Sequence, residues 1–243
     1  MENNKKTNLV EIKKGQTGTG LLIESDGYIS RDVSEYNNKI ITEAINVREN
    51  GEWSVPNPFV MDVILQKFGI QNANGRIYPE HVLKREVEKY QKLIQNKMAL
   101  GECNHPTETS IDLGRVSHNL IECHWEGHTL VGKIEFNLTE GFRKYGICSS
   151  LGDTCANLIL NGYRIGVSSR GMGSVVNKFG QTIVQDDYEI ICWDIVASPS
   201  TPNAYIGTPE ELQPFVEGTE KDGEALNETL SNKISKIENI LKG

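Results

Sequence analysis

The 243-residue sequence lacks any long hydrophobic run. No apolar stretch approaches the roughly 20 residues that a helix needs to cross a bilayer, so no membrane-spanning helix is expected. Residues 1–19 are polar and carry lysines, without the apolar stretch of a secretory signal. We therefore expect a protein that stays in a cytoplasm and has no membrane partner.

Paired cysteine motifs and a surplus of positive charge are also missing. The five cysteines are an odd set without Cys-x-x-Cys spacing, so no disulfide framework is predicted. With 25 Lys and Arg against 33 Asp and Glu, the formal net charge is −8, and the basic residues are scattered along the chain. Such a chain offers no electrostatic footprint for phosphates, so direct nucleic-acid binding is not expected.

Composition divides the chain into a body and two flanking segments. Residues 1–18 have too few apolar groups to offset the entropy of ordering them and are expected to be a disordered tail. Residues 19–213 form one predicted domain. Residues 214–243 contain an acidic linker and an amphipathic helix, which either docks on the body or is offered to a partner protein.

Two segments of the body have helical signals. After Pro79, a residue favoured in a first turn, apolar residues recur at helical spacing as far as about residue 96. A second helix is expected from Asp153, as its N-cap, through Leu160. The rest of the body should therefore be strand and turn.

Strands are predicted where β-forming residues are bounded by turn chemistry. The expected strands are residues 20–24, 59–65, 98–101, 115–125, 129–136, 163–168, 173–177 and 183–196. Gly127 is placed in a hairpin turn and Gly180 in another turn, while residues 39–47 fit strand and helix equally. The fold class is therefore α+β with a mostly antiparallel β structure.

Three short segments combine reactive side chains with glycine or proline: Gly101-Glu-Cys-Asn-His-Pro106, Gly166-Val-Ser-Ser-Arg-Gly-Met-Gly173 and the run from Trp193 to Ala204. A serine becomes a good nucleophile when an imidazole takes its proton, and the imidazole needs a group that fixes its tautomer. Asp194, a lone acid in an apolar strand, is the candidate for that group. Each segment alone is common in ordinary turns and loops, so only their combination is informative.

A zinc site is the competing interpretation. Cys123, His124 and His128 lie close together in the sequence, and His118 is nearby. The two histidines of a zinc helix must share one helical face, whereas Gly127 lies in a predicted hairpin turn. We therefore expect no metal and no other cofactor.

The segments around His105, Ser168 and Asp194, taken in order, resemble the prohead core proteases of T-even-like tailed phages. The upstream run Asn74-Gly-Arg-Ile-Tyr-Pro79, followed by an amphipathic helix, fits the same pattern. The likeness extends over residues 59–206. These capsid maturation proteases are related to the herpesvirus assemblins, so the resemblance implies an assemblin-like β-barrel core surrounded by helices, with flexible tails.

The resemblance also implies a serine endopeptidase and assigns its residues. Ser168 matches the nucleophile and His105 the general base, while Ser169 is only the neighbour of the nucleophile. Asp194 is the expected third member, with Glu102 as the alternative, because branches of the family differ at this point.

The oxyanion formed during such a reaction needs preorganised donors. Backbone amides of an Arg170-Gly171 turn are the expected source. Arg170 itself either braces that turn by hydrogen-bonding carbonyls or lies in solvent, and bracing is favoured.

Proteases of this group often cut after glutamate with an aliphatic residue two positions earlier, and they are made as zymogens. Leu9-Val-Glu11 and Leu22-Ile-Glu24 have that pattern, so self-cleavage is expected after Glu11 or Glu24. Leu120-Ile-Glu122 has it too, but lies in a predicted strand where cleavage should be blocked.

The resemblance implies that the substrates are phage scaffold and major capsid proteins, cut inside the assembling prohead in the host cytoplasm. A homo-oligomer is expected. The alternative from another class is a non-enzymatic capsid or scaffold component, for which the acidic balance and the C-terminal helix would suffice.

Overall fold

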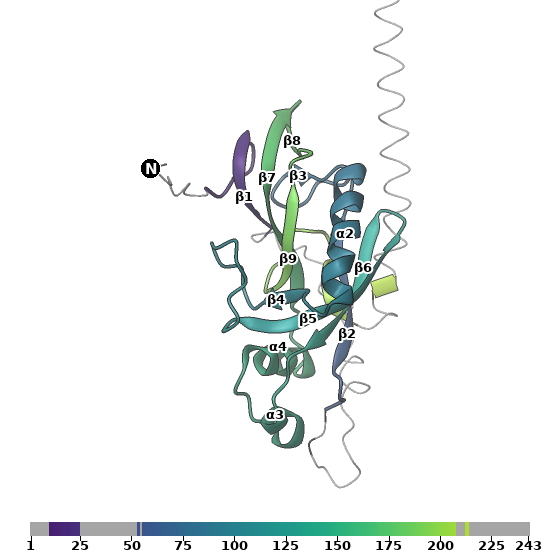
Figure 1. Ribbon diagram of the computed structural model, residues 1–243, viewed down its shortest axis with the longest axis vertical. Helices are drawn as coiled ribbons and strands as arrows, with labels where there is room; N and C mark the ends of the chain where they lie inside the picture. Colours follow the sequence, from purple (N-terminus) through teal and green to yellow (C-terminus); the bar gives the residue numbers. More distant parts are fainter. Residues whose placement is uncertain (1–9, 25–52, 54, 208–211, 214–243) are drawn as a thin grey trace, which may run out of the picture.

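The computed structural model describes residues 10–24, 53, 55–207 and 212–213. In this part of the chain two five-stranded sheets pack together with three helices, which confirms the α+β class (Figure 1). Residues 39–47 and the predicted C-terminal helix lie outside the described residues. None of the helices described is long and apolar enough to span a membrane.

The first sheet is built around one long strand, β7 (Gly166–Lys178). Its other strands are β1 (Gly18–Ile23), β9 (Glu189–Val196), β8 (Gln181–Val184) and β3 (Arg76–Ile77). Strands β1, β8 and β9 pair antiparallel with β7, and β3 pairs parallel with β8. The sheet therefore brings residues from both ends of the described chain to β7.

Strand β7 passes through the position where the sequence predicted a turn between two strands. That prediction is wrong, because Gly171 serves close packing instead. A Cβ at Gly171 would lie 2.5 Å from the Tyr188 ring, and the strand continues with only a register shift against β9.

The second sheet has the order β10-β2-β6-β5-β4 with antiparallel neighbours throughout. Its strands are β10 (Ile206–Gly207), β2 (Val60–Lys67), β6 (Thr129–Phe136), β5 (Val116–Glu126) and β4 (Leu100–Glu102). The predicted hairpin at Gly127 is confirmed, with φ at 53° in the turn between β5 and β6.

The helices agree in part with the sequence. Helix α2 (Glu80–Gln95) begins after Pro79, as predicted. Helix α4 (Leu151–Leu160) has Ser150 as its N-cap, so the N-cap role predicted for Asp153 is wrong. Asp153 instead completes a capping box from the third helical position. The short helix α3 (Glu140–Tyr145) was not predicted.

The predicted strand over residues 183–196 is also interrupted. Strand β8 ends at Val184 and β9 begins at Glu189, with a turn between them. Asp187 stabilises this turn by accepting bonds from the amide and hydroxyl of Ser174 at 2.9 and 2.8 Å. The sequence prediction joined the two strands because the aspartates of this turn are flanked on both sides by apolar runs.

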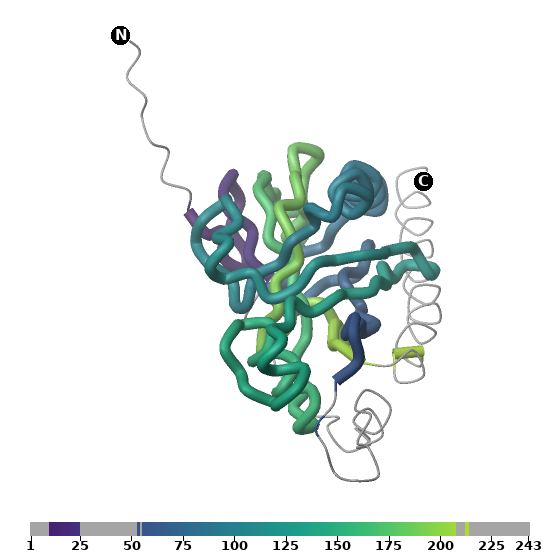
Figure 2. The backbone as a smooth tube through the Cα atoms, turned by 60° about the horizontal axis from the view of Figure 1, so that its bottom comes forward, coloured from purple at the N-terminus to yellow at the C-terminus, as the bar shows by residue number. Residues whose placement is uncertain are grey.

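Strand pairing in the described residues forms two sheets and not one closed barrel. Isolated bridges, Cys103 with Ile195 and Gly166 with Tyr205, connect the sheets. Figure 2 shows the teal β5–β6 hairpin running across the light-green β9. The main apolar core lies between the sheets, and a smaller cluster lies under the first turns of α2 against the first sheet.

Part of the predicted tail is packed on the body. Ile12 is buried, its amide donates to the Leu21 carbonyl at 3.3 Å, and Thr17 accepts from the Asn177 amide at 2.9 Å. Burial of Ile12 and hydrogen bonds to distant residues, Arg76 and Thr182 among them, hold this segment on the body, and composition alone does not reveal such contacts.

Candidate active site

Ser168 lies in β7 directly opposite Asp194 of β9. Opposed residues of an antiparallel pair project from the same face, with Cβ atoms roughly 4.5–5.5 Å apart. Ser169 is paired with Trp193 and projects from the other face, because side chains alternate along a strand. Register thus places Ser168, and not Ser169, beside the Asp194 carboxylate.

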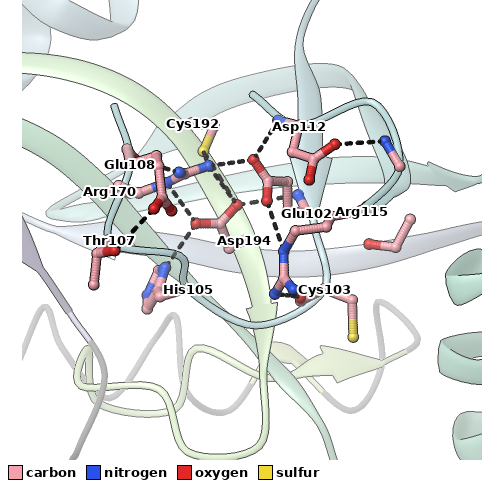
Figure 3. Close-up of polar contacts among 12 residues, drawn as sticks. Glu102, Cys103, His105, Thr107, Glu108, Asp112, Arg115, Arg170, Cys192 and Asp194 are labelled. Carbon is pink, nitrogen blue, oxygen red and sulfur yellow. Dashed lines mark hydrogen bonds and ion pairs between the residues drawn. The ribbon is translucent and has the colours of Figure 1, made fainter. Parts of the chain in front are cut away.

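His105 is brought to Asp194 by the loop that follows β4. The Asn104 amide donates to the Ile195 carbonyl at 2.8 Å, and Asn104 has φ at 63°, a left-handed conformation that asparagine tolerates. The chain then reverses, and His105 Nδ1 lies 2.6 Å from Asp194 Oδ2 (Figure 3). The His105 side chain is only 3% exposed.

The Asp194 carboxylate is buried but well partnered. Its Oδ1 accepts from the Glu102 amide at 3.0 Å, and Arg170 Nε lies 3.0 Å from Oδ2. Burial favours a higher pKa, but the hydrogen bond and charge of His105, then Arg170 and the Glu102 amide, lower the pKa of Asp194 below its usual value. An ionised Asp194 holds a proton on Nδ1 of His105, which leaves Nε2 as the acceptor.

Glu102, the alternative third residue, faces two arginines instead of His105. Its carboxylate accepts from Arg170 Nη2 at 2.9 Å, from Arg115 Nε at 3.1 Å and from the Asp112 amide at 2.9 Å. Figure 3 shows Asp194 lying between His105 and Glu102. Glu102 therefore supports the loop and Arg170 rather than the imidazole.

Arg170 is fully buried, so the solvated alternative is wrong; Arg170 does hydrogen-bond a carbonyl, but in the loop of His105 and not in a turn of its own. Burial disfavours its charge, but Cys192, Asp194 and Glu102 together raise its pKa above the usual value. Its Nη1 donates to the Glu108 carbonyl at 2.7 Å, which braces the loop that carries His105. The turn assigned to Arg170 and Gly171 is instead part of β7.

Ser168 and His105 flank the same carboxylate, but the described contacts do not join them. The Ser168 hydroxyl donates to the Glu24 carbonyl, which also accepts the Ser200 amide at 3.1 Å. His105 Nε2 is buried without a hydrogen-bond partner among the described residues. Catalytic hydrogen bonds are often incomplete before a substrate complex forms, so this nitrogen remains free to take a proton.

Sequence reasoning did not assign Ser200 or the Asn72–Tyr78 segment to the site. The run Asn74-Gly-Arg-Ile-Tyr-Pro79 was noted without a role, and it lies against Glu24: Arg76 Nη1 is 2.7 Å from Glu24 Oε1. The available signal was a motif, but its partner is about 50 positions away in the chain.

Two cysteines lie near the loop of His105. Cys103 Sγ is 3.6 Å from Cys155 Sγ, and both are free thiols. The hydrogen bond from Cys155, opposed by burial and aided by Arg115, lowers the pKa of Cys103 to about 7.

The residues of the zinc alternative are spread along the β5–β6 hairpin. His124 is exposed and lies 3.1 Å from Glu126, whereas burial raises the pKa of Cys123 to about 12. Burial lowers the pKa of His118 to about 4. Within the described residues no three His, Cys, Asp or Glu side chains gather in a group that could hold a metal.

Comparison with known proteins gives consistent results. A model of the prohead core protein serine protease family matches residues 21–215. The chain is 31% identical over 160 residues to the prohead core protein protease of Enterobacteria phage T4, covering 65% of this chain and 71% of that protein. The structure of the bacteriophage T4 capsid assembly protease is similar, with a TM-score of 0.52 and 26% identity, over 58% of this chain and 82% of that one.

Proposed function

Because the chain belongs to the prohead core protein serine protease family and is a protease, we propose that it cleaves scaffold and major capsid proteins inside the immature prohead. The family assignment supports this role over that of a non-enzymatic capsid or scaffold component. Residues 19–213 are the proposed protease domain, acting in the host cytoplasm as a homo-oligomer. The relationship to the assemblins also remains a proposal, while the closed barrel core is replaced by two sheets joined through isolated bridges.

Ser168 is the proposed nucleophile, His105 the general base and Asp194 the residue that orients it. The observation that carries this assignment is the 2.6 Å contact of His105 Nδ1 with Asp194 Oδ2. Asp194 is also the residue that pairs with Ser168 across β7 and β9. Buried Asp194 fixes the imidazole tautomer, so Nε2 is the atom that receives the hydroxyl proton.

The proposed reaction is acyl transfer. His105 Nε2 takes the Ser168 proton as Oγ attacks the peptide carbonyl, then gives it to the leaving amine, and water hydrolyses the ester by the reverse steps. Amides near Arg170 and Gly171 are the proposed oxyanion donors. The enzyme needs no metal or organic cofactor for these steps. Self-cleavage after Glu11 or Glu24 is proposed as part of its maturation.

The test is co-expression of the chain with its own major capsid and scaffold proteins, followed by mass spectrometry of the new termini. The proposal predicts discrete cleavage of both proteins, and none with Ser168→Ala. Normal processing with Ser168→Ala would instead support the non-enzymatic role.

A further inference from the structure

The Glu24 carboxylate is buried beyond the end of β1, and both of its oxygens accept hydrogen bonds. Its relative exposure is 0%. Five side chains donate to it, at 2.5 to 3.0 Å: Arg76 and Tyr78 to Oε1, and Asn72, Asn74 and Ser200 to Oε2. A buried carboxylate is expensive without such partners, so this pocket is built to hold a glutamate.

The charge of the pocket is complementary to that of its occupant. Burial disfavours the charge of Arg76, but the adjacent Glu24 raises its pKa above the usual value. Burial and then the Glu24 charge raise the pKa of Tyr78 well above its usual value, so the phenol remains a donor. One cation and four neutral donors surround one carboxylate.

The backbone of the same residue lies on the proposed nucleophile. The Glu24 carbonyl accepts the Ser168 hydroxyl and the Ser200 amide, at 3.1 Å for the latter. Its amide donates to the Ser169 carbonyl at 3.3 Å, which continues the antiparallel pairing of β1 with β7. Peptides commonly bind by adding a strand to a sheet in this way.

A second pocket lies two residues earlier. Leu22 projects from the same face of the strand as Glu24 and is fully buried in the smaller apolar cluster, which also contains the Tyr78 ring. Tyr78 therefore contributes its ring to the cluster around Leu22 and its hydroxyl to Glu24.

We propose that β1 and Glu24 lie in the substrate groove as the enzyme's own first substrate, and that the five donors form the pocket that selects glutamate at the cleaved bond. This inference rests on the proposed function and deepens it. The Leu22 site selects an aliphatic residue two positions earlier, and the Ser200 amide is a donor to the oxyanion. While β1 remains bound, Ser168 is covered and no other substrate reaches it.

The reaction at this site is balanced by the chain's own groups and water. Ser168 Oγ turns from the carbonyl oxygen to the carbonyl carbon of Glu24 and bonds to it, while its proton goes to His105 Nε2. The peptide bond that follows Glu24 breaks, and its nitrogen takes that proton. Water then hydrolyses the ester, so Glu24 gains a terminal carboxylate and Ser168 regains its proton.

The experiment follows self-cleavage of the purified full chain by intact-mass spectrometry. Release of residues 1–24 is expected in the wild type and absent in Ser168→Ala. Glu24→Gln loses the charge that all five donors address and should slow this cut at least about 100-fold, because each hydrogen bond to a charged group contributes substantially. Glu11→Gln should leave cleavage after Glu24 unchanged.

The pocket is tested separately with Tyr78→Phe, which removes one hydroxyl and keeps the ring, so folding should survive. It should slow both self-cleavage and cleavage of co-expressed scaffold protein about tenfold. Tyr90→Phe, at a buried tyrosine of the main core, is the matched control and should change neither rate. Glu24→Gln should cleave scaffold protein only as residues 1–24 are released, because β1 covers Ser168 until then.

These outcomes separate the two proposals. If the wild type and Ser168→Ala process scaffold protein alike, the proposed function fails. If the wild type processes scaffold protein while residues 1–24 stay attached, the function stands and the inference is overturned. Self-cleavage of Glu24→Gln or Tyr78→Phe at the wild-type rate overturns it as well.

Discussion

Replacement of Asp194 by asparagine, compared with Glu102→Gln, separates orientation of His105 from structural support. Both carboxylates are fully buried and both contact Arg170. Only Asp194 contacts His105, at 2.6 Å. The two substitutions should therefore cost similar stability but differ greatly in their effect on catalysis.

The magnitudes follow from these contacts. Each substitution removes one of two carboxylates from a buried arginine, and breaking a buried ion pair typically costs about 3–5 kcal/mol. Asp194→Asn also removes the group that fixes the imidazole tautomer, which in a well-studied serine protease lowers kcat about 10⁴-fold. Glu102→Gln should lower kcat by no more than about tenfold, since the backbone amide of residue 102 still donates to Asp194.

The assay pairs urea unfolding with the rate of scaffold-protein cleavage, measured where each variant is folded. The expected pattern is comparable loss of unfolding free energy and a rate difference of about 10³-fold between the variants. Equal loss of activity in the two folded variants would refute the assignment of Asp194 as the orienting residue.

Three further predictions concern stability and reactivity. Burial lowers the pKa of His118 to about 4 from an unfolded value of about 6.5, so between these pH values the unfolded state binds a proton that the folded state does not. The free energy of unfolding should therefore fall by up to about 3 kcal/mol as the pH drops from 6.5 to 4, and a free energy of unfolding that is independent of pH in this range would contradict the prediction. Cys103, with a pKa of about 7, should react with iodoacetamide at a rate that rises with a midpoint near pH 7, whereas Cys123, with a pKa of about 12, should stay unlabelled. Peptide mapping that showed faster labelling of Cys123 than of Cys103 would contradict these two pKa shifts. Gly101→Ala places a methyl group 2.3 Å from the His118 ring and should cost about 3 kcal/mol of unfolding free energy, while Gly141→Ala, with no atom closer than 3.9 Å, should cost less than about 1, and equal urea midpoints would disprove the steric argument.

Local sequence signals predicted the elements that depend on local structure. The hairpin at Gly127 and the helix after Pro79 follow from turn chemistry and from spacing, and both were located closely. The course of β7 was missed, because its glycines were interpreted as turn residues. In the structure Gly171 accommodates the Tyr188 ring, a contact made by a residue 17 positions later.

The sequence predicted the three proposed catalytic residues of the candidate site but not the pocket around Glu24. Three motifs identified Ser168, His105 and Asp194, and the structure brings Asp194 into contact with one and into register with the other. The pocket around Glu24 depends on pairing between β1 and β7, about 150 residues apart in sequence, and on a segment between them. Neither spacing nor composition encodes such pairing, so this pocket became visible only in three dimensions.

The central claim is that Ser168 is the nucleophile, and the matched pair Ser168→Ala and Ser169→Ala tests it most directly. Both serines are buried neighbours in β7, and the Ser169 hydroxyl has no hydrogen-bond partner in the described part of the chain. The measurement is the rate of scaffold-protein cleavage on co-expression, read from the new termini. We predict a loss of at least about 10³-fold for Ser168→Ala and less than about tenfold for Ser169→Ala. Cleavage that survives Ser168→Ala, or is lost only with Ser169→Ala, would contradict the assignment.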